Sequence, residues 1–160
     1  MSRRRRGASI AALIVLAASS LRAQGSRVAP EGRLDAIIAR RTAVQAAVGA
    51  DIALSPEIHA ELAAGLGASA GRGRAAGVSA RTDAIFRFLV DPNHSMHWSP
   101  YIGGGIGARY DRGPEWRGVA ILVVGASGRP HGHWIPFVEG GFGGGARIGF
   151  GFRRATTRPR

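Results

Sequence analysis

Four histidines are the first residues whose type and spacing could support chemistry. His131 and His133 form an H-x-H pair, and His94 and His97 stand in another turn-rich stretch. Metal binding needs imidazoles that converge on one ion together with a further ligand or an open position. The two stretches could converge if they lie at the same edge of a sheet, but solvated loop histidines are the commoner case. We therefore predict no metal site.

His59 is the residue around which a hydrolase or acyltransferase site would have to form. Such a site needs a nucleophile within hydrogen-bond reach of a base. Ser69 and Ser79 are the candidate nucleophiles, and no motif fixes their geometry relative to His59. The nearby Glu61 and Asp83 are explained more simply as members of a structural ion-pair network. We therefore expect no enzymatic activity.

The stretch HWSPYIGGGIGARYD, residues 97–111, carries glycines in a pattern that phosphate-binding loops also use. Gly103, Gly105 and Ala108 fit the G-x-G-x-x-A spacing. That fingerprint also needs a buried strand before the glycines, a helix after them and an acidic residue about 20 positions further on. Here a proline closely precedes the glycines, another interrupts the stretch that follows, and no acidic residue stands at that distance. We reject a nucleotide site and expect no cofactor.

The elements that would position these residues alternate with a period of two. In the segments 42–54, 57–69 and 78–90, one phase is apolar, and the other holds glycine, alanine, glutamine and charged side chains. Stretches with proline or glycine separate the segments, which is typical of antiparallel β-structure. Glycine is spread through the segments and not confined to their ends, which disfavours helices. The sequence therefore predicts an all-β protein, although residues 33–41 could begin either a strand or a helix.

The charged side chains of the strands lie on the phase opposite to the apolar residues, and acids and bases balance. The polar face of a soluble sandwich would carry Lys, Thr, Ser and Glu, whereas this face is mostly glycine and alanine. Glycine in a strand often marks a crowded space, and a narrow closed barrel provides one. The charges would then pair inside the lumen, and the apolar phase would face lipid. The predicted lumen ion-pair network is Asp51, Glu57, Glu61, Arg81, Asp83, Arg87, Arg109, Glu139 and Arg147, with Arg117 on the same face.

A repeat places aromatic residues at the ends of the predicted strands. The sequence around Trp98 returns around Trp134, 134 − 98 = 36 residues later. Strands that are two apart in an up-and-down sheet run in the same direction, so both tryptophans would lie at one edge of the barrel. Tyr110 and Trp116 flank the turn at the opposite edge. We predict that these four residues form interfacial aromatic girdles; ordinary core aromatics are the alternative.

The N-terminus has the layout of a secretory signal peptide. Residues 3–6 are all arginine, residues 8–21 are an apolar run, and Leu21, Arg22 and Ala23 offer a cleavage site before Gln24. The apolar run falls short of the ~20 residues that a transmembrane helix needs. The chain has no cysteine, which excludes disulfides, thiolate metal sites and a lipid-modified cysteine anchor.

The formal net charge of +12 does not indicate a nucleic-acid partner. All 22 basic residues are arginine, and five of them stand in the presumed signal peptide. Nucleic-acid-binding proteins cluster such residues on one face and interleave aromatic residues, and no such stripe is present here.

The segments PYIGGGIGARYD and PFVEGGFGGGARIGFGF, behind a signal peptide, resemble strands of small bacterial outer-membrane β-barrels of the outer-membrane protein A-like type. The resemblance implies an up-and-down antiparallel transmembrane β-barrel, usually of eight strands. It also implies membrane lipid and the barrel-assembly machinery as partners, and the bacterial outer membrane as the location. Phe150 and Phe152 fit the aromatic residue with which such barrels often end. Six or seven strands are clear, and an eighth requires residues 33–54 to be divided.

The predicted organisation is a signal peptide (1–23), a short linker (24–32), a β-barrel domain (33–153) and a basic tail (154–160). We expect a non-enzymatic outer-membrane barrel with a structural or surface-interaction role and a lumen filled by small residues and balanced ion pairs. One alternative is a soluble periplasmic β-barrel that binds an apolar ligand with its apolar phase turned inward. The other is a narrow pore or a membrane-embedded hydrolase or acyltransferase. The sequence identifies no ligand.

Overall fold

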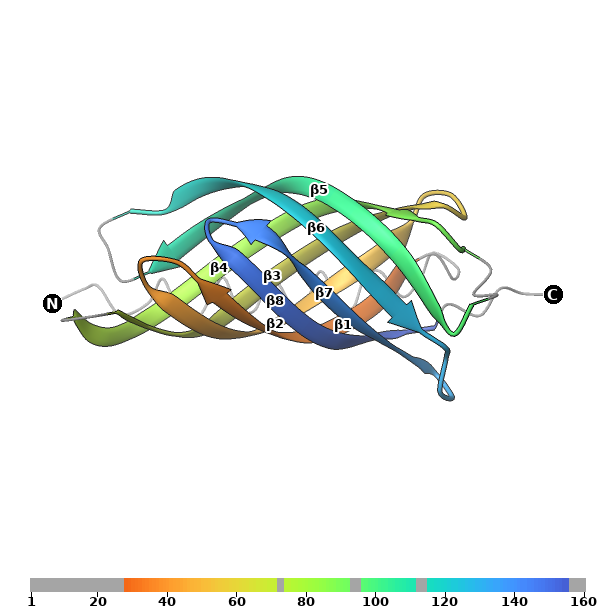
Figure 1. Cartoon of the computed structure of the whole chain (residues 1–160), viewed down its shortest axis with the longest axis horizontal. Coiled ribbons are helices and arrows are strands. Elements are labelled where there is room, and N and C mark those ends of the chain that lie inside the picture. Colours follow the sequence, from red (N-terminus) through yellow and green to blue (C-terminus); the bar gives the residue numbers. More distant parts are fainter. Residues whose placement is uncertain (1–27, 72–73, 93–95, 112–114, 156–160) are drawn as a thin grey trace, which may run out of the picture.

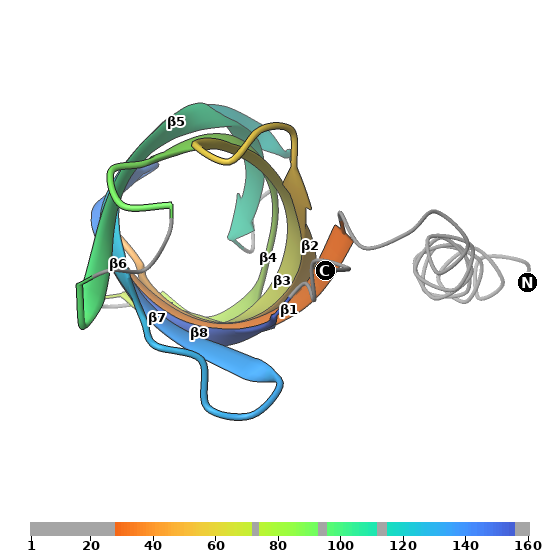
Figure 2. The same cartoon turned by 90° about the vertical axis from the view of Figure 1, so that its right-hand side faces the viewer.

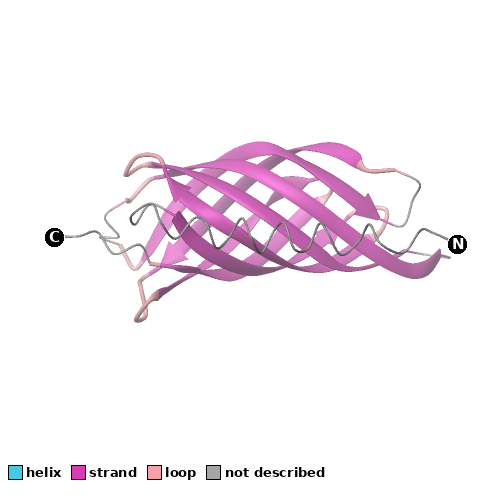
Figure 3. Ribbon diagram, turned by 180° about the vertical axis from the view of Figure 1, so that it is seen from behind, coloured by secondary structure: helices cyan, strands magenta, loops and turns pink. Residues whose placement is uncertain are grey.

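Eight antiparallel strands form a closed barrel in the computed structural model (Figures 1 and 2). The structure describes residues 28–71, 74–92, 96–111 and 115–155. The strands are β1 (Val28–Ile38), β2 (Thr42–Ala53), β3 (Ile58–Gly71), β4 (Arg74–Leu89), β5 (Trp98–Asp111), β6 (Arg117–Gly128), β7 (Trp134–Gly143) and β8 (Ala146–Arg154). Strands make up the whole wall (Figure 3). Among the described residues, no helix has the length and hydropathy to cross a bilayer.

The topology is up-and-down, because each strand pairs with its neighbours in sequence and β1 pairs with β8 to close the ring. β1 therefore begins and β8 ends at one end of the barrel, on the right in Figure 1. We call this the terminal end; it also holds the β2–β3, β4–β5 and β6–β7 connections. The opposite, distal end holds the short connections 39–41, 72–73, 112–116 and 144–145.

The register shifts around the barrel. Following paired residues from Val28 through every strand leads back to β1 at Ile38, a stagger of 38 − 28 = 10 residues. A stagger of this kind requires strands that tilt relative to the barrel axis, as Figure 1 shows, and eight strands leave a lumen just wide enough for side chains. The path passes through Ile52, Ala60, Phe86, Gly104, Leu122, Phe142 and Ala146.

The apolar phase of the strands faces outward. Leu62 and Phe86 are 53% and 62% exposed, whereas Glu61 and Arg87, their neighbours in sequence, are 0% and 1% exposed. An apolar outer belt around a polar lumen is the arrangement of transmembrane barrels. The soluble alternative with its apolar phase turned inward is therefore wrong.

One part of the lumen is apolar, which the charge pattern does not predict. Ile85, Ile121 and Val123 form a buried cluster, and Val119 packs against it. β6 supplies three of these four side chains because its sequence is apolar on both faces. This part of the barrel is filled without ion pairs.

The first strands answer the question that the sequence left open at residues 33–54. The segment is divided by a turn at 39–41, and its first part is strand, so the eighth strand exists. β1 begins at Val28, so the second half of the expected linker (24–32) belongs to the barrel wall. Pro30 and Gly32 are residues that often mark turns and linkers. Here both lie within β1 and face outward. The predicted signal peptide lies outside the described residues, as do residues 156–160 of the basic tail.

The glycines of the 97–111 stretch lie within β5, with no helix after them, so they do not form a phosphate-binding loop. At Gly105, which faces inward, an added Cβ would overlap the backbone oxygen of Ala84 on β4. At Gly104, which faces outward, the nearest atom to an added Cβ is the Ile121 backbone oxygen at 3.6 Å. Close approach of the neighbouring backbone therefore explains the glycine at position 105.

We expect Gly105→Ala to lower the free energy of unfolding by about 1–3 kcal/mol, the usual cost of overpacking. Gly104→Ala is the matched control and should change it by less than about 0.5 kcal/mol. The measurement is urea unfolding of the refolded protein in detergent micelles, followed by tryptophan fluorescence. Equal midpoints for the two variants would contradict the packing explanation.

Candidate functional site

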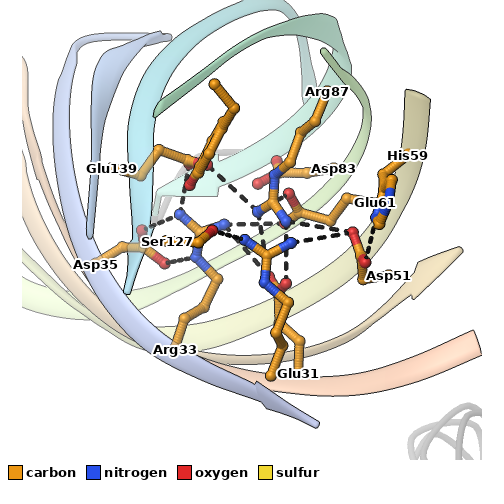
Figure 4. Close-up of polar contacts among 12 residues, drawn as sticks. Glu31, Arg33, Asp35, Asp51, His59, Glu61, Asp83, Arg87, Ser127 and Glu139 are labelled. Carbon is orange, nitrogen blue, oxygen red and sulfur yellow. Dashed lines mark hydrogen bonds and ion pairs between the residues drawn. The ribbon is translucent and has the colours of Figure 1, made fainter. Parts of the chain in front are cut away.

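Charged side chains from six strands meet in the middle of the lumen (Figure 4). Two arginines, Arg33 on β1 and Arg87 on β4, make the most contacts, and both are buried. We call the set the lumen network: Glu31, Arg33, Asp35, Asp51, Glu61, Arg81, Asp83, Arg87, Glu139, Arg147 and Arg153.

Arg33 spans the lumen through carboxylates on three strands. Its Nε and Nη2 donate to the two oxygens of Asp35 at 3.0 and 2.9 Å, a bidentate contact along β1. Its Nη1 donates to Glu61 Oε1 on β3 at 2.9 Å, and its Nη2 donates to Glu139 Oε1 on β7 at 2.7 Å. Guanidinium groups suit such sites, because their donors form a fixed planar fork.

Arg87 shares carboxylates with Arg33. Its Nη1 donates to Glu31 Oε2 at 3.1 Å, its Nη2 donates to Glu139 Oε2 at 3.3 Å, and it forms an ion pair with Glu61. The two arginines and three glutamates therefore form one connected cluster. Because removing one member leaves an opposite charge buried without its partner, such a cluster is sensitive to any single loss.

Two further arginines extend the network. Arg147 Nη1 donates to Asp83 Oδ2 at 3.0 Å, and its Nη2 donates to Glu139 Oε1 at 2.7 Å. Arg81 forms an ion pair with Asp35, and its Nε lies 3.4 Å from Asp83 Oδ2. Across the lumen network five arginines face six carboxylates, and the ring of His59 contacts Asp51 at 2.7 Å, so acids and bases nearly balance.

Two aromatic rings lie among these cations. Phe137 has the guanidinium carbons of Arg33 and Arg87 at 5.5 and 5.4 Å from its ring centroid, which are cation–π distances. The ring centroid of Tyr101 lies 5.2 Å from the guanidinium carbon of Arg87, and the Tyr101 hydroxyl donates to Glu139 Oε2 at 3.1 Å. The repeat aligns these two residues, so their common inward orientation follows from it.

A separate set of contacts lies at the distal end of the lumen. Arg109 forms an ion pair with Asp111 at 2.6 Å and donates to the backbone oxygen of Gly144 at 3.3 Å. Ser79 Oγ donates to Asp111 Oδ1 at 2.5 Å and accepts from Gln45 Nε2 at 2.6 Å. Arg109 therefore faces the lumen as predicted but pairs outside the central cluster.

The prediction for Glu57 is wrong. The structure places the other predicted lumen residues inward, whereas Glu57 is exposed in the β2–β3 turn. Ser55 shapes this turn, because its Oγ accepts from the backbone nitrogens of Glu57 and Ile58 at 3.2 and 3.0 Å. Arg117, at the start of β6, is also exposed.

Four members of the lumen network do not appear in the sequence prediction. Three of them, Glu31, Arg33 and Asp35, alternate with outward residues on β1. Their period of two was the available signal. The linker interpretation of residues 24–32 hid Glu31, and the open choice between strand and helix at residues 33–41 hid Arg33 and Asp35. The fourth, Arg153, is the last inward residue of β8 and donates to Ser127 Oγ at 2.6 Å.

The aromatic residues predicted for the girdles lie near the two ends of the barrel. Trp98 and Trp134 begin β5 and β7 at the terminal end and are exposed. Tyr110 and Trp116 lie at the distal end, with ring centroids 5.9 Å apart.

The candidate catalytic residues do not come together. His59 and Ser69 are ten residues apart on β3, roughly 33 Å at about 3.3 Å per residue. Ser79 pairs in register with Gly67, eight residues from His59.

Within the described ranges, no group of three or more potential ligands could hold a metal ion. His97, His131 and His133 are exposed, and His94 lies outside the described residues.

Two solved structures share this architecture. A de novo designed transmembrane β-barrel aligns over 82% of this chain and 96% of its own, with a TM-score of 0.53 and 15% identity. The N-terminal β-barrel domain of Pseudomonas aeruginosa OprF aligns over 81% of this chain and 98% of its own, with a TM-score of 0.54 and 14% identity. No protein-family model and no curated protein sequence matches the chain.

The chain has the fold of a small transmembrane β-barrel. The fold that the sequence resemblance implies is confirmed. The closed eight-stranded wall, its apolar outer belt and its charged lumen therefore describe a membrane barrel.

We expect Arg87→Met to lower the free energy of unfolding by about 3–5 kcal/mol, because it leaves buried carboxylates without a cation. Arg117→Ala is the control, since this arginine is exposed, and it should change stability by less than about 0.5 kcal/mol. Urea unfolding in detergent micelles measures both.

The double variant Arg87→Met/Glu61→Gln tests the cause of that loss. It removes one of the carboxylates that the first substitution leaves unpaired, so it should be destabilised by less than the sum of the single variants. Additive losses would show that Arg87 and Glu61 do not stabilise each other.

Proposed function

We propose that the protein is a structural β-barrel of the bacterial outer membrane with a closed lumen and no enzymatic activity. The observation that carries the proposal is the set of ion pairs that crosses the lumen. Arg33 on β1 holds Glu61 on β3 and Glu139 on β7, and Arg87 on β4 holds the same two carboxylates. A lumen bridged between opposite walls has side chains where a pore would need water.

Three observations support the location. The outer wall is an apolar belt, and Trp98, Trp134, Tyr110 and Trp116 lie near its two ends, where interfacial girdles are found. The sequence predicts a signal peptide, which would direct the chain to export. One solved barrel with this fold is a domain of a Pseudomonas aeruginosa protein. Insertion by the barrel-assembly machinery would follow from this location.

At the distal end, the lengths of the connections favour a structural role over a surface-interaction role. Outer-membrane barrels typically carry longer loops on one side, and such loops are where binding residues concentrate. The distal connections 39–41, 72–73, 112–116 and 144–145 are all short. The distal end therefore offers little material for a loop-built binding site.

A charge on the belt should block membrane assembly. We expect Leu62→Arg to cost roughly 2–4 kcal/mol if the residue lies near the bilayer midplane, because the guanidinium faces hydrocarbon. The control is Glu57→Arg, in an exposed turn outside the strands. The measurement is the heat-modifiable fraction of the protein in isolated outer membranes. Normal assembly of Leu62→Arg, or recovery of the unaltered protein from the periplasm without detergent, would overturn the proposal.

A second prediction follows from the proposed closed lumen. The purified protein, reconstituted in planar bilayers, should show no steady ionic current, because the lumen network and the Ile85 cluster fill the interior. A porin added to the same bilayer serves as the positive control. A stable unitary conductance of the unaltered protein would favour the pore alternative.

A further inference from the structure

An open groove lies on the outer wall at the terminal end, across β1 and β8. Its lining includes Gly32, Leu34, Trp134, Phe150 and Phe152, with His131 at its rim. The strand residues among them face outward, so the groove is continuous with the apolar belt. Figure 2 shows that the β6–β7 connection, which carries His131, projects outward from the ring.

Gly32 makes room in this groove. It faces outward between Pro30 and Leu34 on β1 and pairs in register with Phe152 on β8. An added Cβ at Gly32 would meet no atom within 4 Å, so this glycine is not required by a close backbone approach. Large apolar side chains surround the open space, which suits a hydrocarbon chain.

A cation lies at the aqueous end of the groove. Arg154 ends β8 and is directly paired with Trp134, so both side chains lie next to each other on the outer face. Arg129 and His131 of the β6–β7 connection are also exposed at this end. An apolar groove that ends at a tryptophan and an arginine matches a lipid, whose acyl chain meets an anionic headgroup.

Backbone hydrogen bonds hold the rim of the groove in place. His131 N donates to the Trp134 oxygen at 2.8 Å, and Trp134 N donates to the His131 oxygen at 3.2 Å. Ala155 N donates to the His133 oxygen at 2.8 Å, which ties the β6–β7 connection to the end of β8. The groove is therefore formed before a ligand arrives, and this reduces the cost of binding.

We propose that this groove binds one anionic phospholipid, with an acyl chain over Gly32 and the phosphate at Arg154. The outer face of a transmembrane barrel is covered by lipid, so the occupant is present wherever the protein is inserted. The site goes beyond the structural role proposed above and does not depend on the lumen.

The test compares lipid retention by native mass spectrometry. The full chain, folded in detergent with phosphatidylglycerol or with phosphatidylcholine, should retain one phosphatidylglycerol. Gly32→Leu should reduce retention by at least about fivefold, because the leucine side chain fills the open space at Gly32. Arg154→Gln should reduce it about fivefold, the contribution of one arginine near an anionic headgroup.

Matched controls separate the site from general effects. Gly118→Leu fills equally open space on the outer face of β6, near the distal end, and Arg40→Gln removes an exposed arginine of the β1–β2 turn. Both should retain lipid as the unaltered chain does. Heat-modifiable migration of each sample shows that the barrel is folded, so a lost site is distinguished from failed assembly.

Several outcomes would overturn the proposal. Equal retention by Gly32→Leu and Gly118→Leu would remove the groove as the site. Equal retention of phosphatidylcholine would remove the anionic selectivity. A dimer in the same spectra that Gly32→Leu abolishes would assign the groove to a second copy of the chain. An N-terminal segment of the full chain that resists proteolysis in the unaltered protein, but is cleaved in Gly32→Leu, would assign the groove to that segment.

Discussion

An arginine buried inside a narrow barrel must have carboxylates around it, and the rest of this structure depends on that requirement. Arg33 and Arg87 are buried in a wall whose outer side is apolar, so little water is available to solvate them. Glu61 and Glu139 contact both arginines and join β3 and β7 to β1 and β4. This pairing also fixes the register, because a shift of one residue would turn Glu61 toward lipid and Leu62 toward the lumen.

The two faces of the wall were predictable from the sequence because the period of a strand is two. The outward phase from residue 42 onward and the inward charges on β3, β4, β7 and β8 follow from alternation alone. Alternation does not show where a strand stops, so it predicts Glu57 in the lumen although the turn begins before this residue. The predicted barrel domain begins too late for a related reason, because Pro30 and Gly32 are turn-forming residues that here belong to β1.

The partners within the lumen could not be predicted in the same way. Arg33 and Glu139 are 106 positions apart and lie on strands that are not neighbours. They meet because the stagger of ten residues sets which inward side chains share a level. That stagger follows from all eight pairings together, and no single strand carries it. The apolar cluster at Ile85 and the aromatic ring of Phe137 fill lumen space beside the charges, and the same stagger sets which charged groups they meet.

The backbone ladder and the lumen network act in different directions. Hydrogen bonds of the sheet join each strand only to its two neighbours, so they close the ring but do not fix its cross-section. Glu139 accepts hydrogen bonds from Arg33, Arg87, Arg147 and Tyr101, which lie on β1, β4, β8 and β5. Contacts between strands on different sides of the ring resist flattening of the cylinder, which the ladder alone would permit. The lumen network therefore makes the barrel more rigid than its backbone ladder alone would, because Glu139 ties β7 to β1, β4 and β5, which share no ladder hydrogen bonds with β7.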